Sequence, residues 1–232
     1  MSNLEITTNQ TRGIPIWEPV FDDEILSAPG AVTYAMGTVL ARKSVADAVV
    51  AAADGGNTGN GTVTLATVAA GQIVPIVGAY RLECTGAVTN GGIFKLEDPN
   101  GALVASDLIM TAGAGAATVF EAAGLQFTVT DGGTDFAVGD FFTLTVAADG
   151  KIVIYSRTGA GGAQIPLAIL TQEEVFTGAE DRAFRPLISG RVRRDDLVVH
   201  GVGAVNDAEV DALRDFSMVA LPTTQLAELD NQ

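Results

Sequence analysis

The chain has 232 residues, of which 47% are hydrophobic and 18% charged, and its formal net charge is −15. This length and composition fit one or two globular domains with a packed core. So acidic a protein repels phosphate backbones, which excludes nucleic acid as an expected direct partner. A single cysteine, Cys84, excludes an intrachain disulfide. The first residues carry no secretory signal and no apolar run could span a bilayer, so we expect synthesis in a cytoplasm and no membrane partner.

Residues 1–30 are predicted to form an extended arm, because Pro15, Pro19 and Pro29 forbid a continuous helix. The arm is nevertheless rich in apolar side chains and holds Trp17, the only tryptophan. It either packs onto its own domain or adds a strand to the sheet edge of a partner. The candidate binding residues are Ile14, Pro15, Ile16, Trp17, Pro19, Val20 and Phe21.

The next stretch, "AMGTVLARKSV" at 35–45, is predicted to be a short strand that ends at Arg42-Lys43. The composition then changes to small and flexible residues in "ADAVVAAADGGNTGNG" at 46–61. Gly and Asn at this density predict a linker or a long loop.

From 62 to 146 apolar residues alternate with polar ones. Tyr80, Leu82 and Cys84 fall on one face, which makes Cys84 a core residue rather than a nucleophile. Asn100-Gly101 predicts a hairpin turn. Several short strands of this kind, separated by turn residues, predict a small β-sandwich or barrel.

The stretch "VTDGGTDFAVGDFFTLTV" at 129–146 raises the question of a calcium loop. Asp131, Asp135 and Asp140 are spaced too widely for an EF-hand, and no closing glutamate follows. We therefore expect turns, with Gly132-Gly133 reversing the chain into the last hairpin of this region. We expect no metal.

The sequence contains few residues that could carry out catalysis. His200, the only histidine, lies in "LVVHGVG", which predicts a strand residue, and no serine lies in a nucleophile elbow. The acidic pairs Asp22-Asp23, Glu173-Glu174 and Asp195-Asp196 lie in polar or turn contexts and are read as solvated. We expect no enzyme activity, no catalytic residue and no cofactor.

After residue 150 the pattern predicts further strands, including two runs around Gly190. The last predicted element is a helix capped by Asn206, with Glu209 completing a capping box. Arg191, Arg193 and Arg194 are the candidate interface charges. They either lie on a solvated strand edge or pair with acidic groups across an interface.

Several segments in this order resemble the head decoration (capsid cement) proteins of lambda-like tailed phages. They are "MGTVLARKS" at 36–44, "GKIVIYS" at 150–156, "AQIPLAILTQEEV" at 163–175, "RPLISGRV" at 185–192 and "VNDAEVDALRDF" at 205–216. The resemblance implies a mainly β fold with minor α. It implies an N-terminal arm at 1–30, a discontinuous decoration domain at 31–45 plus 150–232, and an inserted β-sandwich or immunoglobulin-like domain at 46–149.

The resemblance also implies a function. Proteins of this family form homotrimers on the outer surface of the expanded head, bind the major capsid protein and stabilise the shell against DNA pressure. Their N-terminal arm orders on the capsid by strand pairing, and the arginines could then face a trimer or capsid interface. The alternative is a head-surface adhesion module whose inserted β-domain binds host or environmental glycans.

Overall fold

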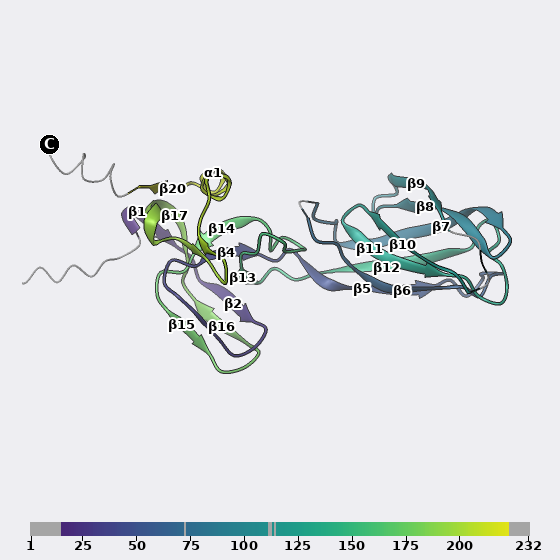
Figure 1. Ribbon diagram of the computed structural model, residues 1–232, viewed down its shortest axis with the longest axis horizontal. Helices are drawn as coiled ribbons and strands as arrows, with labels where there is room; N and C mark the ends of the chain where they lie inside the picture. The colour runs from purple at the N-terminus through teal and green to yellow at the C-terminus, as the bar shows by residue number, and fades with distance from the viewer. Residues whose placement is uncertain (1–14, 72, 111–112, 114, 223–232) are drawn as a thin grey trace, which may run out of the picture. The chain divides into compact units, whose positions relative to one another are not determined.

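The computed structural model describes residues 15–71, 73–110, 113 and 115–222. Strands make up 55% of the chain, with one short α-helix, and they form two curled half-barrel sheets (Figure 1). This confirms the mainly β class with minor α.

The chain divides into two compact units, which we call the terminal unit (1–40 with 166–232) and the central module (41–165). The module reaches further at both ends than the 46–149 implied by the resemblance.

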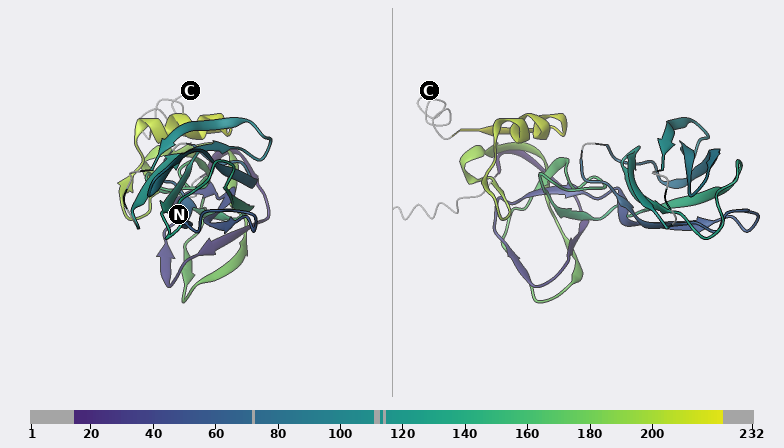
Figure 2. Two further views of the ribbon diagram at one scale, coloured as in Figure 1. Left: turned by 90° about the vertical axis from the view of Figure 1, so that its right-hand side faces the viewer. Right: turned by 45° about the vertical axis from the view of Figure 1, so that its right-hand side comes forward.

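The central module is built on one antiparallel eight-stranded sheet in the order β10-β11-β6-β5-β12-β7-β8-β9. Its strands curl around a common core (Figure 2). The strands are β5 (Val45–Ala53), β6 (Thr62–Val68), β7 (Gly78–Val88), β8 (Gly91–Glu97), β9 (Leu103–Ile109), β10 (Ala117–Ala122), β11 (Leu125–Thr130) and β12 (Phe141–Ala148), and β13 (Ile152–Ile154) follows.

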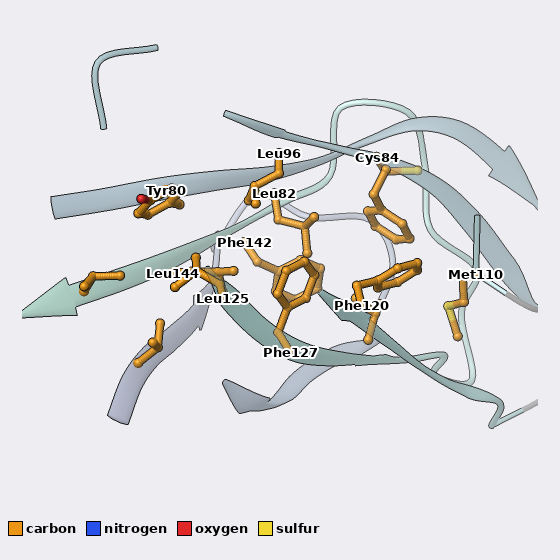
Figure 3. Packing of buried hydrophobic residues seen from close by; sticks show 14 of the residues in the cluster. Tyr80, Leu82, Cys84, Leu96, Met110, Phe120, Leu125, Phe127, Phe142 and Leu144 are labelled. Carbon is orange, nitrogen blue, oxygen red and sulfur yellow. The ribbon is translucent and has the colours of Figure 1, made fainter. Parts of the chain in front are cut away.

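The alternation predicted for this region is confirmed by burial. Tyr80, Leu82 and Cys84 on β7 are buried, and Leu125, Phe127 and Val129 on β11 and Phe142, Leu144 and Val146 on β12 are buried with them. Their side chains meet in one cluster (Figure 3). Aromatic rings pack edge to face within it: the ring centroids of Phe94 and Phe136 lie 5.1 Å apart. Edge-to-face packing matches the positive edge of one ring to the negative face of the other.

The predicted linker at 46–61 is partly wrong, because 45–53 form strand β5. Val45 and Val49 point into the core, and β5 pairs with β12 on one side and with β6 on the other. Small residues obscured a strand that tertiary packing holds in place. Only the Gly- and Asn-rich part, 54–61, is a loop.

The predicted last hairpin is also wrong. β11 pairs with β10 and β6, whereas β12 pairs with β5 and β7. The loop 131–140 therefore connects two strands that are separated by β6 and β5 in the sheet. Alternation tells which face of a strand is buried but does not tell which strand is its neighbour. The hairpin at Asn100-Gly101 is confirmed: the Asp98 carboxylate accepts the backbone N–H groups of Asn100 and Ala102 in the β8–β9 turn.

The terminal unit is assembled from both ends of the chain. β2 pairs with β16, β3 with β15 and β1 with β17, all antiparallel, and β20 runs parallel to β17. Its elements are β1 (Pro15–Phe21), β2 (Glu24–Ala28), β3 (Val32–Tyr34), β4 (Val39–Arg42, which ends in the module), β14 (Pro166–Ile169), β15 (Glu174–Phe176), β16 (Glu180–Phe184), β17 (Leu187–Arg193), the 3-10 turn η1 (Arg194–Asp196), β18 (Val198–Val199), β19 (Gly203–Ala204), α1 (Asp207–Asp215) and β20 (Met218–Leu221).

Helix α1 begins where the sequence predicts. The Asn206 side chain accepts the Glu209 N–H, and the Glu209 carboxylate accepts the Asn206 N–H, so the capping box is complete. Val210 and Leu213 are buried, and the helix packs on β20 and β14. Strand β20, which follows the helix, was not predicted.

Two smaller expectations need correction. Residues 187–193 form one strand through Gly190 rather than two runs around it, because the positive φ of Gly190 (135°) lets the chain continue with a local kink. His200 lies in the turn between β18 and β19 rather than in a strand.

Candidate interaction surface

Strand β1 forms one edge of the terminal unit. Among the described strands it pairs only with β17, with Trp17 opposite Arg191 and Phe21 opposite Leu187. Pro19 is tolerated here because an edge strand has N–H groups with no ladder partner to lose. The sequence left two alternatives for the arm, and residues 15–28 follow the first, pairing within their own chain. Ile14 and the side chains of Pro15, Ile16 and Trp17 lie outside what the structure describes.

The end of β1 exposes apolar side chains beside a hollow. Val20 is 49% exposed and Phe21 37%. The hollow has a volume of about 410 Å³ and is lined by Phe21, Thr171, Gln172, Phe184 and Arg185. The Arg185 Nε lies 2.9 Å from the Asp23 Oδ1, but both side chains are largely exposed. Such a surface ion pair contributes little, so Arg185 can exchange its partner at small cost.

A buried carboxylate, that of Glu174 on β15, binds Gln172, which lines this hollow. Glu174 is 7% exposed and accepts hydrogen bonds from Gln172 Nε2 (2.6 Å) and Arg182 Nη1 (3.1 Å). The hydrogen bond to Glu174 raises the pKa of Arg182, whose guanidinium also lies 4.4 Å from the Phe176 ring centroid. The expectation that Glu173-Glu174 is a solvated pair is therefore wrong for Glu174. On β15, Glu174 and Phe176 face inward and Val175 outward, so hydrophobicity alone would misplace Glu174 and Val175.

The three candidate arginines do not form one cluster. Arg191 and Arg193 lie on the same face of β17, with buried Val192 between them, as the sequence predicts. Arg194 belongs to η1, and its Nη2 lies 2.6 Å from the Asp207 Oδ1 in the first turn of α1. Arg194 therefore helps to anchor the helix, and only the other two arginines remain as a surface pair.

The aspartate-rich loop of the central module organises backbone. Burial alone raises the pKa of Asp140, but N–H groups donated by Ala137, Thr58 and Gly59 outweigh burial and lower that pKa below its ordinary value. The Asp135 carboxylate accepts the Asn90 N–H. Both oxygens of Asp131 are buried, and no described residue donates a hydrogen bond to them. In the described part of the chain, no three His, Cys, Asp or Glu residues lie where they could hold a metal ion.

Of the remaining candidate chemical groups, Cys84 is buried in the core and His200 is half-buried against Tyr34. Burial raises the pKa of the Cys84 thiol, which is 0% exposed. His200 packs edge-on against Tyr34, with ring centroids 5.1 Å apart. No helix in the described ranges has the length and apolarity needed to cross a membrane.

The central module offers no aromatic platform for sugars in its hollow. Its described hollow, about 280 Å³, is lined by aliphatic and small residues and one carboxylate: Ala69, Ala70, Gly71, Ile73, Glu121, Ala122, Ala123, Gly124 and Leu125. The rings of Phe94, Phe127 and Phe142 lie in the core, as the inward alternation of the aromatics predicts. Phe141 is only partly buried, and the Arg81 guanidinium stacks on it at 4.3 Å.

Comparison with known proteins assigns no family. No protein-family model matches the chain, and no curated protein matches it. Two crystal structures of Xanthomonas campestris FlgL are similar to part of it, at 22% and 24% sequence identity and a TM-score of 0.33 each. The similar regions cover 50% and 49% of this chain and 33% of the FlgL chain. The chain thus spans about a third of the length of these proteins, and a likeness at this TM-score supports no statement about function.

Proposed function

We propose that this protein is a non-enzymatic capsid decoration protein that binds the outer surface of an expanded phage head as a trimer and stabilises the shell. Its partners would be the major capsid protein and two further copies of itself. The observation that carries the proposal is the edge strand β1, which exposes Val20 and Phe21 beside the hollow at Phe184 and Arg185. Exposed apolar side chains at an open sheet edge are typical of surfaces that bind a partner.

The order of the chain segments supports the same proposal. Of the segments that resemble decoration proteins, 185–192, 205–216 and most of 163–175 fall within the terminal unit, whereas 36–44 crosses its boundary and 150–156 falls within the central module. The terminal unit is interrupted by a module with a core of its own. A decoration domain with an inserted β-domain would have this arrangement.

The stabilising action follows from mass action. A protein that binds the expanded shell but not its dissociated or unexpanded subunits lowers the free energy of the expanded form by RT ln(1 + [L]/Kd). Three copies joined as a trimer bind neighbouring sites at high effective concentration, so weak individual contacts suffice.

The test uses point substitutions in β1. Removing residues 1–25 would also delete strands that pair with β17 and β16, so its effect on binding could not be separated from its effect on folding. We instead combine Val20→Ser and Phe21→Ser in one double variant, the β1 variant. The matched control is Val50→Ser with Val119→Ser, which replaces two exposed apolar residues of the central module (66% and 59% exposed).

Each variant is mixed with bare expanded heads assembled from the major capsid protein that the proposal names as its partner. Bound copies are counted by quantitative electrophoresis, and the temperature of head disruption is measured by light scattering. We expect the β1 variant to bind at least about ten-fold more weakly, because burying two apolar side chains contributes several kcal/mol. The control should saturate and stabilise heads like the unmodified protein. An unmodified protein that fails to bind heads would refute the proposal, and equal binding by all three proteins would refute the role of β1.

A further inference from the structure

The basic residues of this acidic protein are almost all engaged. Of its 13 lysines and arginines, Arg12 lies outside the described residues. Ten of the remaining twelve make a hydrogen bond, ion pair or ring contact: Arg42, Lys43, Arg81, Lys95, Lys151, Arg157, Arg182, Arg185, Arg194 and Arg214. Within the described part of the chain, Arg191 and Arg193 are the two for which no such interaction is found. Acidic residues outnumber basic ones 28 to 13, so two cations for which the described residues supply no partner are unexpected.

These two arginines lie side by side. They are two residues apart on β17, so their side chains leave the same face of the sheet, roughly 7 Å apart along the strand. On the neighbouring parallel strand β20, Val219 lies opposite Arg191 and Leu221 opposite Arg193. Both apolar residues are partly exposed, whereas Met218 and Ala220 are buried. Figure 1 shows β20 beside β17. We call Arg191, Arg193, Val219 and Leu221 the arginine face.

We propose that the arginine face binds an extended acidic segment of a partner protein, with two carboxylates on alternate residues meeting Arg191 and Arg193. An extended chain places residues i and i+2 on one side at the same spacing as the two arginines. A guanidinium holds a carboxylate through two parallel hydrogen bonds, which gives geometric as well as electrostatic selection. The identification of this partner as the shell protein rests on the proposed function. The recognition of carboxylates by the two arginines is independent of it.

Charge balance favours this occupant over a neutral or basic one. At −15 the protein as a whole repels acidic partners, so binding one requires a local site of the opposite sign. Two neighbouring guanidiniums also repel each other, and a carboxylate at each relieves that repulsion. The apolar row of Val219 and Leu221 adds surface that a bound strand would remove from water.

The test measures binding of a short fluorescent peptide in which glutamate alternates with threonine, by anisotropy at about 0.15 M salt, where exposed charges interact only over about 8 Å. A second peptide carries glutamine in place of glutamate. Arg191→Gln with Arg193→Gln is compared with Arg81→Gln with Arg214→Gln. The control pair removes the same charge from two exposed arginines that already have carboxylate partners.

We expect the glutamate peptide to bind the unmodified protein and the control, and to bind the Arg191/Arg193 variant about ten-fold more weakly. The glutamine peptide should bind none of them comparably. Equal loss in the two variants, or equal binding of the two peptides, overturns the proposal. A chain ending at Pro222 that binds the peptide when the full chain does not also overturns it, because the occupant would then be the protein's own residues 223–232.

This assay contains no heads, so it separates the two proposals. Heads that bind the Arg191/Arg193 variant as well as the unmodified protein would show that the arginine face serves a partner other than the shell. Loss of head binding only in the β1 variant, with peptide binding retained, would place the two recognition surfaces on different elements of the same unit.

Discussion

The two units of the molecule use their residues differently. The central module encloses a continuous cluster of apolar side chains, in which rings such as Phe94, Phe136 and Phe142 pack edge to face. The terminal unit interleaves strands from both ends of the chain, such as β2 with β16 across more than 150 residues of sequence. It carries the arginine pair on β17 and ends in the edge strand β1, where Val20 and Phe21 are exposed beside a hollow. A large aromatic core stabilises the module from within, whereas the terminal unit depends on pairing between distant strands and presents at β1 an edge that can take a partner.

The largest loss of stability is expected for Phe127→Ala, which tests whether the core of the central module is stable independently of the terminal unit. Phe127 is 0% exposed and its ring lies 5.8 Å from that of Phe120. We expect the module to lose about 3–5 kcal/mol of stability through lost transfer energy and the cavity left behind. Urea unfolding followed by far-UV circular dichroism measures the loss.

The control for this substitution is Val119→Ala, on the neighbouring strand and 59% exposed, which should cost less than about 0.5 kcal/mol. The sole tryptophan, Trp17, reports on the terminal unit, so its fluorescence transition should change little. A parallel loss in the tryptophan transition would show that the terminal unit depends on the module core, and the contrast would fail.

An intermediate effect is expected for Asp140→Asn. The carboxylate accepts three backbone N–H groups, and the amide cannot accept them all, so we expect a loss of about 2 kcal/mol at pH 7. Because the pKa of Asp140 is lowered on folding, its contribution is present above the unfolded pKa of about 3.9 and is lost as pH falls through the folded value.

The difference between Asp140→Asn and the unmodified protein should therefore shrink as pH falls below about 4, as urea unfolding at several pH values would show. Asp135→Asn is the matched control, because that exposed carboxylate accepts one N–H from Asn90. A difference that is independent of pH would mean that charge plays no part in holding the loop.

The smallest effect is expected in the terminal unit. Asn206→Ala removes half of the capping box of α1 and should cost about 1 kcal/mol. Hydrogen exchange of the α1 amides should quicken about five-fold, while exchange in the module core should not change. Glu209→Gln keeps an acceptor oxygen for the Asn206 N–H and should lose less. Faster exchange across the whole protein would instead tie the two units into one cooperative structure.

Local patterns predicted what depends on neighbours in sequence. The burial of Leu82 and Phe127, the turn at Asn100-Gly101 and the capping box at Asn206 all follow from a few consecutive residues. The pairing of β11 with β6 rather than β12 could not be predicted, because the sheet order depends on the whole chain. Strand β5 was missed because alanine carries almost no strand signal of its own.

The candidate surface was only partly predictable. The arginine spacing placed Arg191 and Arg193 on one face, as the structure has them. The sequence did not reveal that Arg194 pairs with Asp207, or that Val219 and Leu221 border the arginines, because these neighbours come from segments 13 or more residues away. The buried role of Glu174 was hidden because a carboxylate facing inward is rare unless it is paired.

The two ends of the central module are hydrogen-bonded to each other, which suggests how such a protein could have arisen. Ser44 donates its N–H to the Gly161 carbonyl and Gly150 donates to Lys43, so the chain enters and leaves the module side by side. At Gly162 the backbone lies so close to the Arg42 carbonyl that any side chain would clash. A segment whose two ends already touch can be gained, lost or exchanged by recombination in one step, because only a single narrow gap has to be rejoined. The same property makes this junction a natural place to graft foreign cargo for display.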